Sequence, residues 1–536
     1  MTTTTRFWIS AAAMILFLIA PLHGQNEDNA LTYSYDRPTG TARSIGLGGA
    51  MGALGGDYSA IGINPAGIAI YRSSEFGFTP SVILNETESN YYGTVTSDDN
   101  ISIPINHISY IGSDRYMREV DNGIVSTHFG MGYNRTNNYN RQSFIQGEGI
   151  KSSLLDMFVY NAGSQTTQEL DDFYLGQAYD AYLIDNIAPE NLPEDAAYQY
   201  LHAYEYLDEN LNPQFGPLEN GIDQKKLINE SGNSGQFDLT FGANFSNKIH
   251  LGASLGIATL LNKKSSSHYE QANPNNDPES QYQDYIYYRD LDGREVLDDF
   301  YFDEYEKTNG TGVNLTAGAI FKLMKNIRLG ASFQTPTFYS MDMEYDTEAR
   351  SYFFDADNYE MTSPLGEMSF NFRTPYKATG SFAYIFGNKG LITVDYEYTD
   401  YSAMEYKSND NQMSEVSYFN DLNETISNTF RATHNLRFGA ELKLSPMFAL
   451  RGGYAMFENP YKEDFLNSEG EHFNITGGLG FRVDNMSIDV SYLYNQETYI
   501  HSLYQTDENF LETEYQQPAD MTSTDHQLAV TLGWRF

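Results

Sequence analysis

The 536-residue sequence contains no cysteine. Disulfides, thiolate metal sites and cysteine nucleophiles are therefore all excluded. Basic residues are also scarce, because 32 Lys and Arg stand against 72 Asp and Glu and leave a formal net charge of -40. A chain this acidic is repelled by phosphate backbones, so nucleic acid is excluded as a partner.

Long apolar runs are missing everywhere except at the N-terminus. Residues 7–22 are apolar apart from Ser10, with Arg6 before them and the small Gly24 after them. This order is typical of a secretory signal peptide, which we predict as residues 1–24; a retained signal anchor is the alternative. No later segment approaches the roughly 20 apolar residues of a transmembrane helix. If the exported chain crosses a membrane, we expect it to do so with strands.

Aromatic residues and glycine are abundant instead, with 43 Tyr, 33 Phe and 44 Gly. Much of the chain alternates between apolar and polar positions. In residues 236–245 the odd-numbered side chains, from Phe237 to Phe245, are apolar, and residues 249–257 repeat the pattern after a short turn. Two runs with this period of two, joined by a tight turn, predict an antiparallel hairpin. Composition and alternation together predict a large all-β protein.

Fourteen segments carry the alternation, an even number as closed single-chain barrels require. We predict strands at 74–84, 100–111, 122–134, 235–245, 248–260, 311–323, 327–345, 366–386, 389–406, 431–443, 446–457, 472–483, 485–498 and 525–536. Short turns join them at one end. Long loops, at about 135–234, 262–310 and 402–430, join them at the other. A soluble sandwich has no reason to segregate its loops, so residues 74–536 are predicted to form a fourteen-stranded antiparallel transmembrane β-barrel.

The alternation also assigns faces. Charged positions are expected to face the lumen, among them Asp395, Arg437, Glu441 and Arg451. Apolar positions at the C-terminus are expected to face lipid, namely Leu532, Trp534 and Phe536, with Phe536 as the terminal signal for the barrel assembly machinery. Pro375 interrupts the eighth segment, and because an even strand number is needed we predict one bent strand there.

Residues 25–73 do not alternate. They carry a Gly-rich stretch that includes Gly46, Gly48 and Gly49, and then the turn Asn64-Pro65-Ala66-Gly67. A dinucleotide loop is excluded, since Met51 stands where the third glycine belongs and no strand precedes the stretch. Glycines permit tight folding and the Asn-Pro pair sets a rigid turn. We therefore predict a compact segment inside the lumen whose Asn64–Gly67 turn controls passage; a periplasmic tail is the alternative.

These residues carry a resemblance to a known family. Arg43–Gly56, followed by Asn64–Gly67, resembles the N-terminal hatch of FadL/TodX-type outer-membrane transporters of hydrophobic compounds, the long-chain fatty acid transporter family. Further segments match in the same order: Ile327–Pro336, Phe370–Pro375, Val394–Met404, Leu436–Gly453 and Gly477–Tyr494. The resemblance covers about residues 41–84 and 311–536.

The resemblance implies a hatch-plugged barrel in the outer membrane of a Gram-negative bacterium, in contact with its lipids and lipopolysaccharide. It implies that extracellular loops capture a hydrophobic small molecule such as a long-chain fatty acid. Hatch rearrangement would then release the ligand through a lateral opening where the third strand kinks. In this sequence Gly123, Gly130 and Gly132 would permit that kink.

The loop at 135–234 is predicted to contain three helices, near 153–163, 170–184 and 193–207. Its aromatic and apolar residues are candidates for ligand capture, namely Phe158, Phe173, Tyr174, Leu201 and Tyr204. The alternative is that these residues only pack the loop helices on each other. Between residues 146 and 231 there are 16 acids and 3 bases, which disfavours a fatty carboxylate and leaves neutral lipids or aromatics.

No catalytic or metal-binding pattern emerges. The ten His are scattered without ligand spacing, and no Ser-His-Asp arrangement can be singled out. We therefore expect no enzyme activity, no metal and no cofactor. Three functions remain: a transporter of hydrophobic molecules, a surface receptor or binding barrel, for example for haemin, and a structural or adhesive barrel. The predicted hatch favours the transporter, because a purely structural barrel needs no mobile plug.

Overall fold

The fold is known from a computed structural model. The residues it describes are 27–37, 39–115, 123–186, 200–207, 213–215, 220–273, 296–354, 357–409, 413–504 and 517–536. The predicted signal peptide, residues 1–24, lies outside them.

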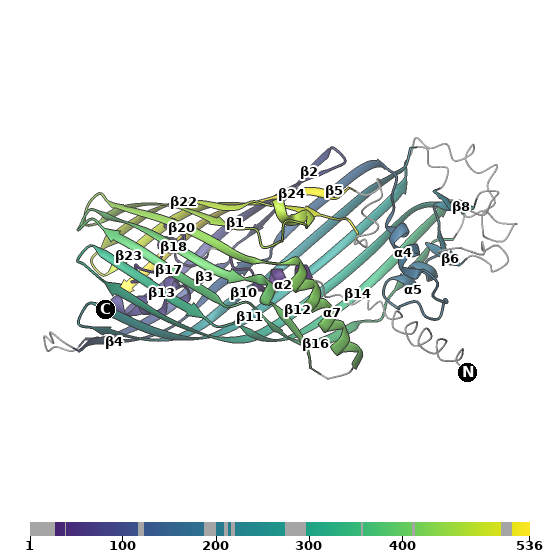
Figure 1. The fold of residues 1–536 in the computed structure, drawn as a ribbon. Helices are drawn as coiled ribbons and strands as arrows, with labels where there is room; N and C mark the ends of the chain where they lie inside the picture. Colours follow the sequence, from purple (N-terminus) through teal and green to yellow (C-terminus); the bar gives the residue numbers. More distant parts are fainter. Residues whose placement is uncertain are drawn as a thin grey trace, which may run out of the picture.

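The chain forms a closed antiparallel barrel of fourteen wall strands (Figure 1). In wall order these are β1 (Glu75–Tyr91), β3 (Ile105–Arg115), β4 (Ile124–Asn138), β10 (Ile222–Phe245), β11 (Ile249–Ala272), β12 (Val296–Lys322), β13 with β14 (Ile327–Gln334, Phe338–Phe354), β16 with β17 (Gly366–Arg373, Lys377–Ile385), β18 with β19 (Gly390–Asp400, Glu405–Ser408), β20 (Ala432–Lys443), β21 (Phe448–Phe457), β22 (His472–Val483), β23 (Met486–His501) and β24 (Ala519–Arg535). Closure is made by β1 and β24, which pair from Glu75 with Arg535 to Asn90 with Asp520. The predicted fold class and strand number are confirmed.

Side chains divide between the two faces as the alternation predicts. Apolar side chains such as Leu251, Phe438 and Leu528 are 42%, 40% and 49% exposed on the outer surface. So broad an apolar band suits lipid rather than water. Inside, Arg451 Nε donates to Glu441 Oε2 over 2.8 Å, within a network of lumen charges that also includes Asp395 and Arg437.

The C-terminal strand follows the same rule. Phe536 is 65% exposed, and Leu532 and Trp534 share its outward face. Arg535 points the other way and donates to Glu75 Oε2 over 2.5 Å. The outward direction of the three apolar residues is confirmed, while the role of Phe536 in assembly stays a prediction.

Three neighbouring wall strands are each interrupted at one level. The breaks lie at residues 335–337, 374–376 and 401–404, and the first two contain Pro336 and Pro375. On either side of the breaks the pairing is in step, since Phe338 faces Arg373 and Gln334 faces Lys377. Because proline cannot donate to a ladder, the wall bends here. The bent strand predicted at Pro375 is confirmed; the other two breaks were not predicted.

The wall strands extend further on the extracellular side than predicted. The expected loop at 262–310 is wrong at both ends, because β11 continues to Ala272 and β12 begins at Val296. Residues 135–234 also contain more strand, including β5 (Arg141–Ile150), which pairs with the start of β10. The hairpin strand β2 (Thr94–Ser102) pairs with the outer half of β1. These extensions rise above the lipid, so they lack the apolar alternation that marks the rest.

Helices lie mainly in the long loops. The first predicted helix is present as α4 (Leu154–Ala162). The second is present only in part, as α5 (Leu175–Asp180), because Ile184 at its predicted end belongs to a strand. The third is wrong where the chain is described, because residues 200–202 form β7, paired with β6 (Ile184–Asn186), and 205–207 form β8, paired with β9 (Pro213–Phe215). Hairpin pairing thus overrides a weak helical period; Pro193 lies outside the described residues. An unpredicted helix, α7, spans Met413–Thr429. Among the described helices, none has the length and apolar character needed to cross a membrane.

Candidate functional site

The candidate site is the lumen where it meets residues 27–37 and 39–73, here called the N-terminal segment. Its elements are α2 (Glu27–Ser34), α3 (Ala42–Gly46) and two short 3-10 helices, η1 (Ser59–Gly62) and η2 (Pro65–Ile70). They lie inside the barrel (Figure 1). α3 packs on β21 to β24, whereas η2 packs on β4, β10, β11 and β12. The segment therefore crosses the lumen from one wall to the opposite wall.

Glycines allow the segment to approach the wall backbone closely. Gly48 has a φ of +63°, and a Cβ there would lie 2.9 Å from both Phe438 O and Tyr454 N. On the wall side of the same contact, a Cβ at Gly453 would lie 2.2 Å from Gly48 N. Gly46 similarly faces Gly478, and Gly49 has a φ of +75° beside Arg437. Gly46 and Gly48 thus lie at backbone-to-backbone contacts with the wall, whereas Gly49 faces the Arg437 side chain.

The Asn64–Gly67 turn fastens the other end of the segment. Asn64 is 1% exposed, and its Oδ1 accepts from Ala66 N over 3.1 Å at the start of η2. Its Nδ2 donates to Gly52 O over 2.8 Å and to Ala319 O, on β12, over 3.2 Å. Pro65 occupies the first helical position, where its missing N–H costs nothing.

The wall is shaped to receive this turn. A Cβ at Gly318 would lie 2.0 Å from Asn64 Oδ1, and one at Gly252 would lie 2.3 Å from Pro65 O. Within the segment, Gly67 packs on Gly55, whose Cβ would approach the Gly67 Cα to 2.7 Å. These wall glycines could not be identified from the sequence, because nothing local marks a contact between chain regions so far apart.

Polar bonds hold the rest of the segment. Asp395 accepts from Gly52 N over 2.8 Å, and Arg328 Nη1 donates to Leu54 O over 2.8 Å. Nearer the extracellular side, Arg37 forms ion pairs with Glu497 at 2.6 Å and Asp525 at 2.7 Å. The segment is therefore fastened both by bonds of a kind that water can replace and by small apolar clusters, such as Leu47 and Met51 with Leu391 of the wall.

A polar cavity of about 150 Å³ lies between the segment and the wall. Its lining includes Arg37, Asp238, Lys377, Glu397 and Arg437. Sites for drug-sized ligands are usually apolar and on the order of 300–1,000 Å³. At about 150 Å³ the cavity is smaller than such sites, and the charged side chains in its lining do not favour a hydrophobic ligand.

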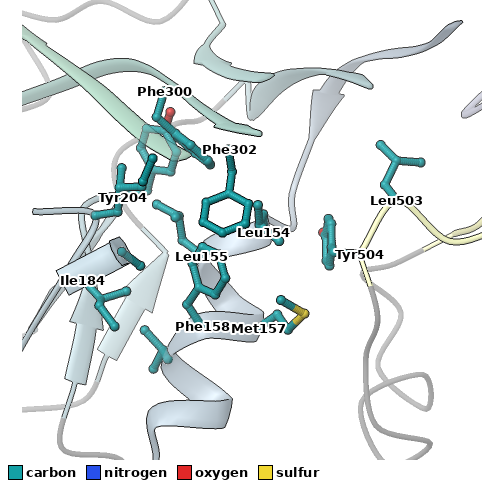
Figure 2. Packing of buried hydrophobic residues seen from close by; sticks show 14 of the residues in the cluster. Leu154, Leu155, Met157, Phe158, Ile184, Tyr204, Phe300, Phe302, Leu503 and Tyr504 are labelled. Carbon is teal, nitrogen blue, oxygen red and sulfur yellow. The ribbon is translucent and has the colours of Figure 1, made fainter. Parts of the chain in front are cut away.

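Three of the predicted capture residues, Phe158, Tyr174 and Tyr204, belong to an apolar cluster above the barrel, in which Figure 2 labels Phe158 and Tyr204. Phe158 is fully buried and its ring centroid lies 5.1 Å from that of Phe302 on β12. Tyr174 packs on the same ring at 5.7 Å, and burial raises the pKa of its hydroxyl, which donates to Glu304. The loop therefore packs on the extended barrel strands, which fits the packing alternative; capture stays a prediction.

Tyr204 lies in the same cluster, whereas Phe173 and Leu201 lie outside it. The ring of Tyr204 lies 6.5 Å from that of Phe300, and Phe173 lies 4.8 Å from Tyr345 on β14. Leu201 is 6% exposed. Among the described residues these side chains are largely covered, so a ligand would have to part them.

Sequence reasoning missed a buried carboxylate that ties this loop to the wall. Glu270 on β11 is fully buried and accepts from Leu154 N over 2.7 Å, Ser153 Oγ over 2.5 Å and Gln224 Nε2 over 2.9 Å. Ser153 also forms a capping box with Asp156, a signal that was readable in the sequence.

The three glycines proposed for a lateral opening have two different surroundings. Gly123 has a φ of +117° at the turn before β4, next to Ser246. Gly130 and Gly132 lie in ladders that are continuous with both β3 and β10. A Cβ at either position would lie within 2.8 Å of Tyr58 in the N-terminal segment. They therefore make room for that segment, and a lateral opening stays a prediction.

Comparison with known proteins adds one firm result. No family model matches the sequence, and no curated protein matches it. A solved FadL homologue from Pseudomonas aeruginosa is 13% identical, with 94% of this chain and 100% of that chain covered at a TM-score of 0.51. The toluene transporter TodX from P. putida is 12% identical over 92% and 98% of the two chains, with a TM-score of 0.48. The first likeness shows that this chain has the fold of the FadL homologue. Among the described residues, no three His, Asp or Glu are grouped to hold a metal.

Proposed function

We propose that this protein is an outer-membrane transporter for the uptake of hydrophobic small molecules, with the N-terminal segment as its hatch. The observation that carries the proposal is the way this segment fills the lumen. It meets the wall through glycine contacts and hydrogen bonds, and the cavity left beside it is only about 150 Å³ with charged side chains in its lining. The shared fold with a FadL homologue and the apolar outer band support the same function.

The hatch works through exchangeable bonds. Each hydrogen bond between the segment and the wall contributes on the order of 1 kcal/mol net, because water takes its place when the segment moves. A ligand that binds the moved state better shifts the population by its differential affinity. The Asn64–Gly67 turn is bonded to β12. Its release frees the part of the hatch that lies between β12 and the polar cavity.

The ligand class follows from charge. The excess of acids in residues 146–231 repels a fatty carboxylate approaching the extracellular side, so a neutral aromatic or lipid suits the protein better. Outer-membrane lipids and lipopolysaccharide surround the barrel, and the assembly machinery reads Phe536. Gly130 and Gly132 leave room for a lateral exit beside β4 if Tyr58 moves away.

The test compares the intact protein with a variant that lacks residues 41–68. In planar bilayers the deletion should conduct far more than the intact protein, and cells with the intact protein should take up naphthalene faster than cells without it. An intact protein as conductive as the deletion would contradict the hatch. Equal uptake of palmitate and naphthalene would contradict the ligand class.

A disulfide provides a second variant in case the deletion fails to assemble. A Cβ at Gly52 would lie 3.1 Å from that of Ser381, slightly closer than the roughly 3.5–4.5 Å of a disulfide, so with a shift of a few tenths of an ångström Gly52→Cys and Ser381→Cys tie the hatch to the wall in a chain without other cysteines. The oxidised form should lose uptake and the reduced form should regain it.

A further inference from the structure

The barrel wall has a gap in its hydrogen bonding at the extracellular end of the ninth strand. β19 pairs with β16 along one edge, from Phe370 with Ser408 to Arg373 with Glu405. β20 pairs with β18 only as far as Asp400 with Ala432. Among the described residues, no strand pairs with the other edge of β19. The strand edge there needs another partner, since unpaired backbone groups are costly to bury.

Helix α7 covers this gap. Its buried side chains are Phe419, Leu422 and Ile426, which are 2%, 8% and 0% exposed. Phe419 stacks on Tyr406 of β19, with ring centroids 5.8 Å apart and planes at 12°. Figure 1 shows α7 running alongside the wall near β16, and its other face is exposed, with Met413 at 89%.

One side chain of α7 takes the place of the missing strand. Asn423 Oδ1 accepts from Tyr406 N over 2.8 Å, and Asn423 Nδ2 donates to Tyr406 O over 2.9 Å. This is the pair of bonds that an opposing residue supplies in an antiparallel ladder. A full strand would supply several such pairs, whereas this pair and the stacking of Phe419 on Tyr406 join α7 to the β19 edge.

The two ends of α7 are held differently. At its C-terminal end, Phe430 forms a β-bridge with Tyr461, and Arg431 Nε donates to the carbonyls of Asn459 and Tyr461. At the other end, Met413 projects into solvent. A movement that breaks the Asn423 bonds would therefore swing α7 about its C-terminal end.

Behind α7 an apolar path leads to the hatch. Phe370 and Phe372 of β16 lie beside Tyr406, with ring centroids 5.4 and 4.8 Å away. Phe372 in turn meets Tyr33 of α2 edge-on at 5.8 Å. These residues belong to one buried cluster that joins α7, the wall strands and α2, and α7 and α2 also contact each other directly. The cluster contrasts with the charged cavity deeper in the lumen.

The gap opens at the outer edge of the membrane. Just below it the outward side chains are aromatic, with Tyr396 43% exposed and hydrogen-bonded to His434. Aromatic side chains of this kind mark the interface in outer-membrane barrels. Further down, Ile392 and Phe438 are 45% and 40% exposed to lipid.

We propose that the gap under α7, between β19 and β20, is an access site where a neutral apolar molecule binds the rings of Phe370, Phe372 and Phe419 and passes to α2. This inference rests on the proposed function and assigns it a route from the membrane interface. The molecule takes the place of the apolar face of α7, and α7 swings on its C-terminal end. Contact with α2 then delivers the ligand to the hatch.

Because the chain has no native cysteine, an engineered disulfide can fix α7 to β19 without competing disulfides. In Tyr406→Cys with Asn423→Cys, oxidation ties α7 to β19 and reduction frees it, so each protein is its own control. The matched control is Asn90→Cys with Asp520→Cys, an exposed pair that faces across β1 and β24. Oxidation of the α7 pair should lower naphthalene uptake at least tenfold, and reduction should restore it; oxidation of the control pair should change nothing.

Photolabelling tests binding at the access site independently of the proposed transport function. Purified protein is irradiated with a neutral aryl diazirine, and labelled peptides are mapped. In the reduced α7 pair we expect label on residues 370–372 and 413–430, and we expect oxidation to abolish it. This result supports the access site even if no cell takes up naphthalene. Absence of uptake would overturn only the proposed function. Equal uptake and equal labelling in both forms would overturn the access site and leave the hatch proposal standing.

A second variant avoids any change to the rings. Asn423→Ala removes both bonds to Tyr406 and keeps the apolar face, so backbone amides of α7 should exchange with deuterium several-fold faster. The matched control, Asn420→Ala, changes an exposed side chain on the same helix. Unchanged exchange in Asn423→Ala would show that the bonds do not hold the helix, which contradicts the proposal.

Discussion

Replacing Asn64 by Ala tests the hatch at its fastening point. Asn64 is 1% exposed and satisfies Gly52 O and Ala66 N, both within the N-terminal segment, while its bond to Ala319 O reaches the wall. The Ala variant leaves the first two groups buried without these partners. Each such loss costs about 1–2 kcal/mol, the lower part of the usual range, so we expect roughly 2–4 kcal/mol in favour of the moved state, where water satisfies both groups.

This magnitude predicts a large effect on gating. Since about 1.4 kcal/mol changes an equilibrium tenfold, the population with the hatch displaced should rise by roughly 30-fold to 1,000-fold. Single-channel recording in planar bilayers measures this population as the open fraction. The control is Asn90→Ala, because Asn90 is exposed on β1. An open fraction that is the same in Asn64→Ala and Asn90→Ala would refute the assignment of Asn64 as a fastening residue.

Three further predictions address other parts of the molecule. Gly48→Ala puts a Cβ 2.9 Å from Phe438 O at a positive φ, so the hatch contact should weaken by about 1–2 kcal/mol and the open fraction should rise; an unchanged open fraction would contradict the close contact. Glu270→Ala deprives Leu154 N and Ser153 of their acceptor, so limited proteolysis within residues 151–186 should become faster, and unchanged rates would contradict a tie between loop and wall. Deletion of Phe536 should lower the yield of heat-modifiable barrel in the membrane, whereas full yield would contradict its role as an assembly signal.

The barrel was predictable because lipid imposes a strict rule on the sequence. Every second side chain from Phe237 to Phe245 has to be apolar to face hydrocarbon, and this period survives in a single sequence. The rule lapses above the membrane. Residues 263–272 and 296–310 are strand in the structure but touch water and loops, so nothing in their pattern distinguished them from the loop that we predicted.

The helices show what local patterns leave undecided. The third helix predicted in the long loop rested on Leu201 and Tyr204, yet Leu201 lies in a strand that pairs with residues 184–186. Conversely, α7 was overlooked although Phe419, Leu422 and Ile426 recur at intervals of three and four, which is a helical period. Tertiary pairing decided the first case, and the second was a readable signal.

The sequence allowed one side of the candidate site to be predicted, the N-terminal segment, but not the wall residues that it contacts. The glycines and the Asn64-Pro65 turn stood out, because their backbone chemistry is local. Their wall partners Gly318 and Gly453 did not, since each matters only through a contact with a distant part of the chain. The charged lining of the cavity could not be predicted either. The alternation shows which residues face the lumen, but not which of them lie next to one another.

If α7 and the hatch act together, α2 has to connect them, and Tyr33 is the residue that joins both sides. Its ring meets Phe372 at 5.8 Å, and its hydroxyl lies 3.1 Å from Thr308 Oγ1 and 3.3 Å from Glu306 Oε1 on β12. Tyr33→Phe keeps the ring contact and removes the hydroxyl, whereas Tyr33→Ala removes both.

We therefore expect naphthalene to raise the open fraction in the intact protein and in Tyr33→Phe, but much less in Tyr33→Ala. Deuterium exchange of α7, measured on the same samples, should still respond to naphthalene in all three, because the access site lies upstream of α2. Coupling of this kind requires a residue whose loss separates the two responses. An open fraction that rises equally in Tyr33→Ala would show that the ligand reaches the hatch without α2.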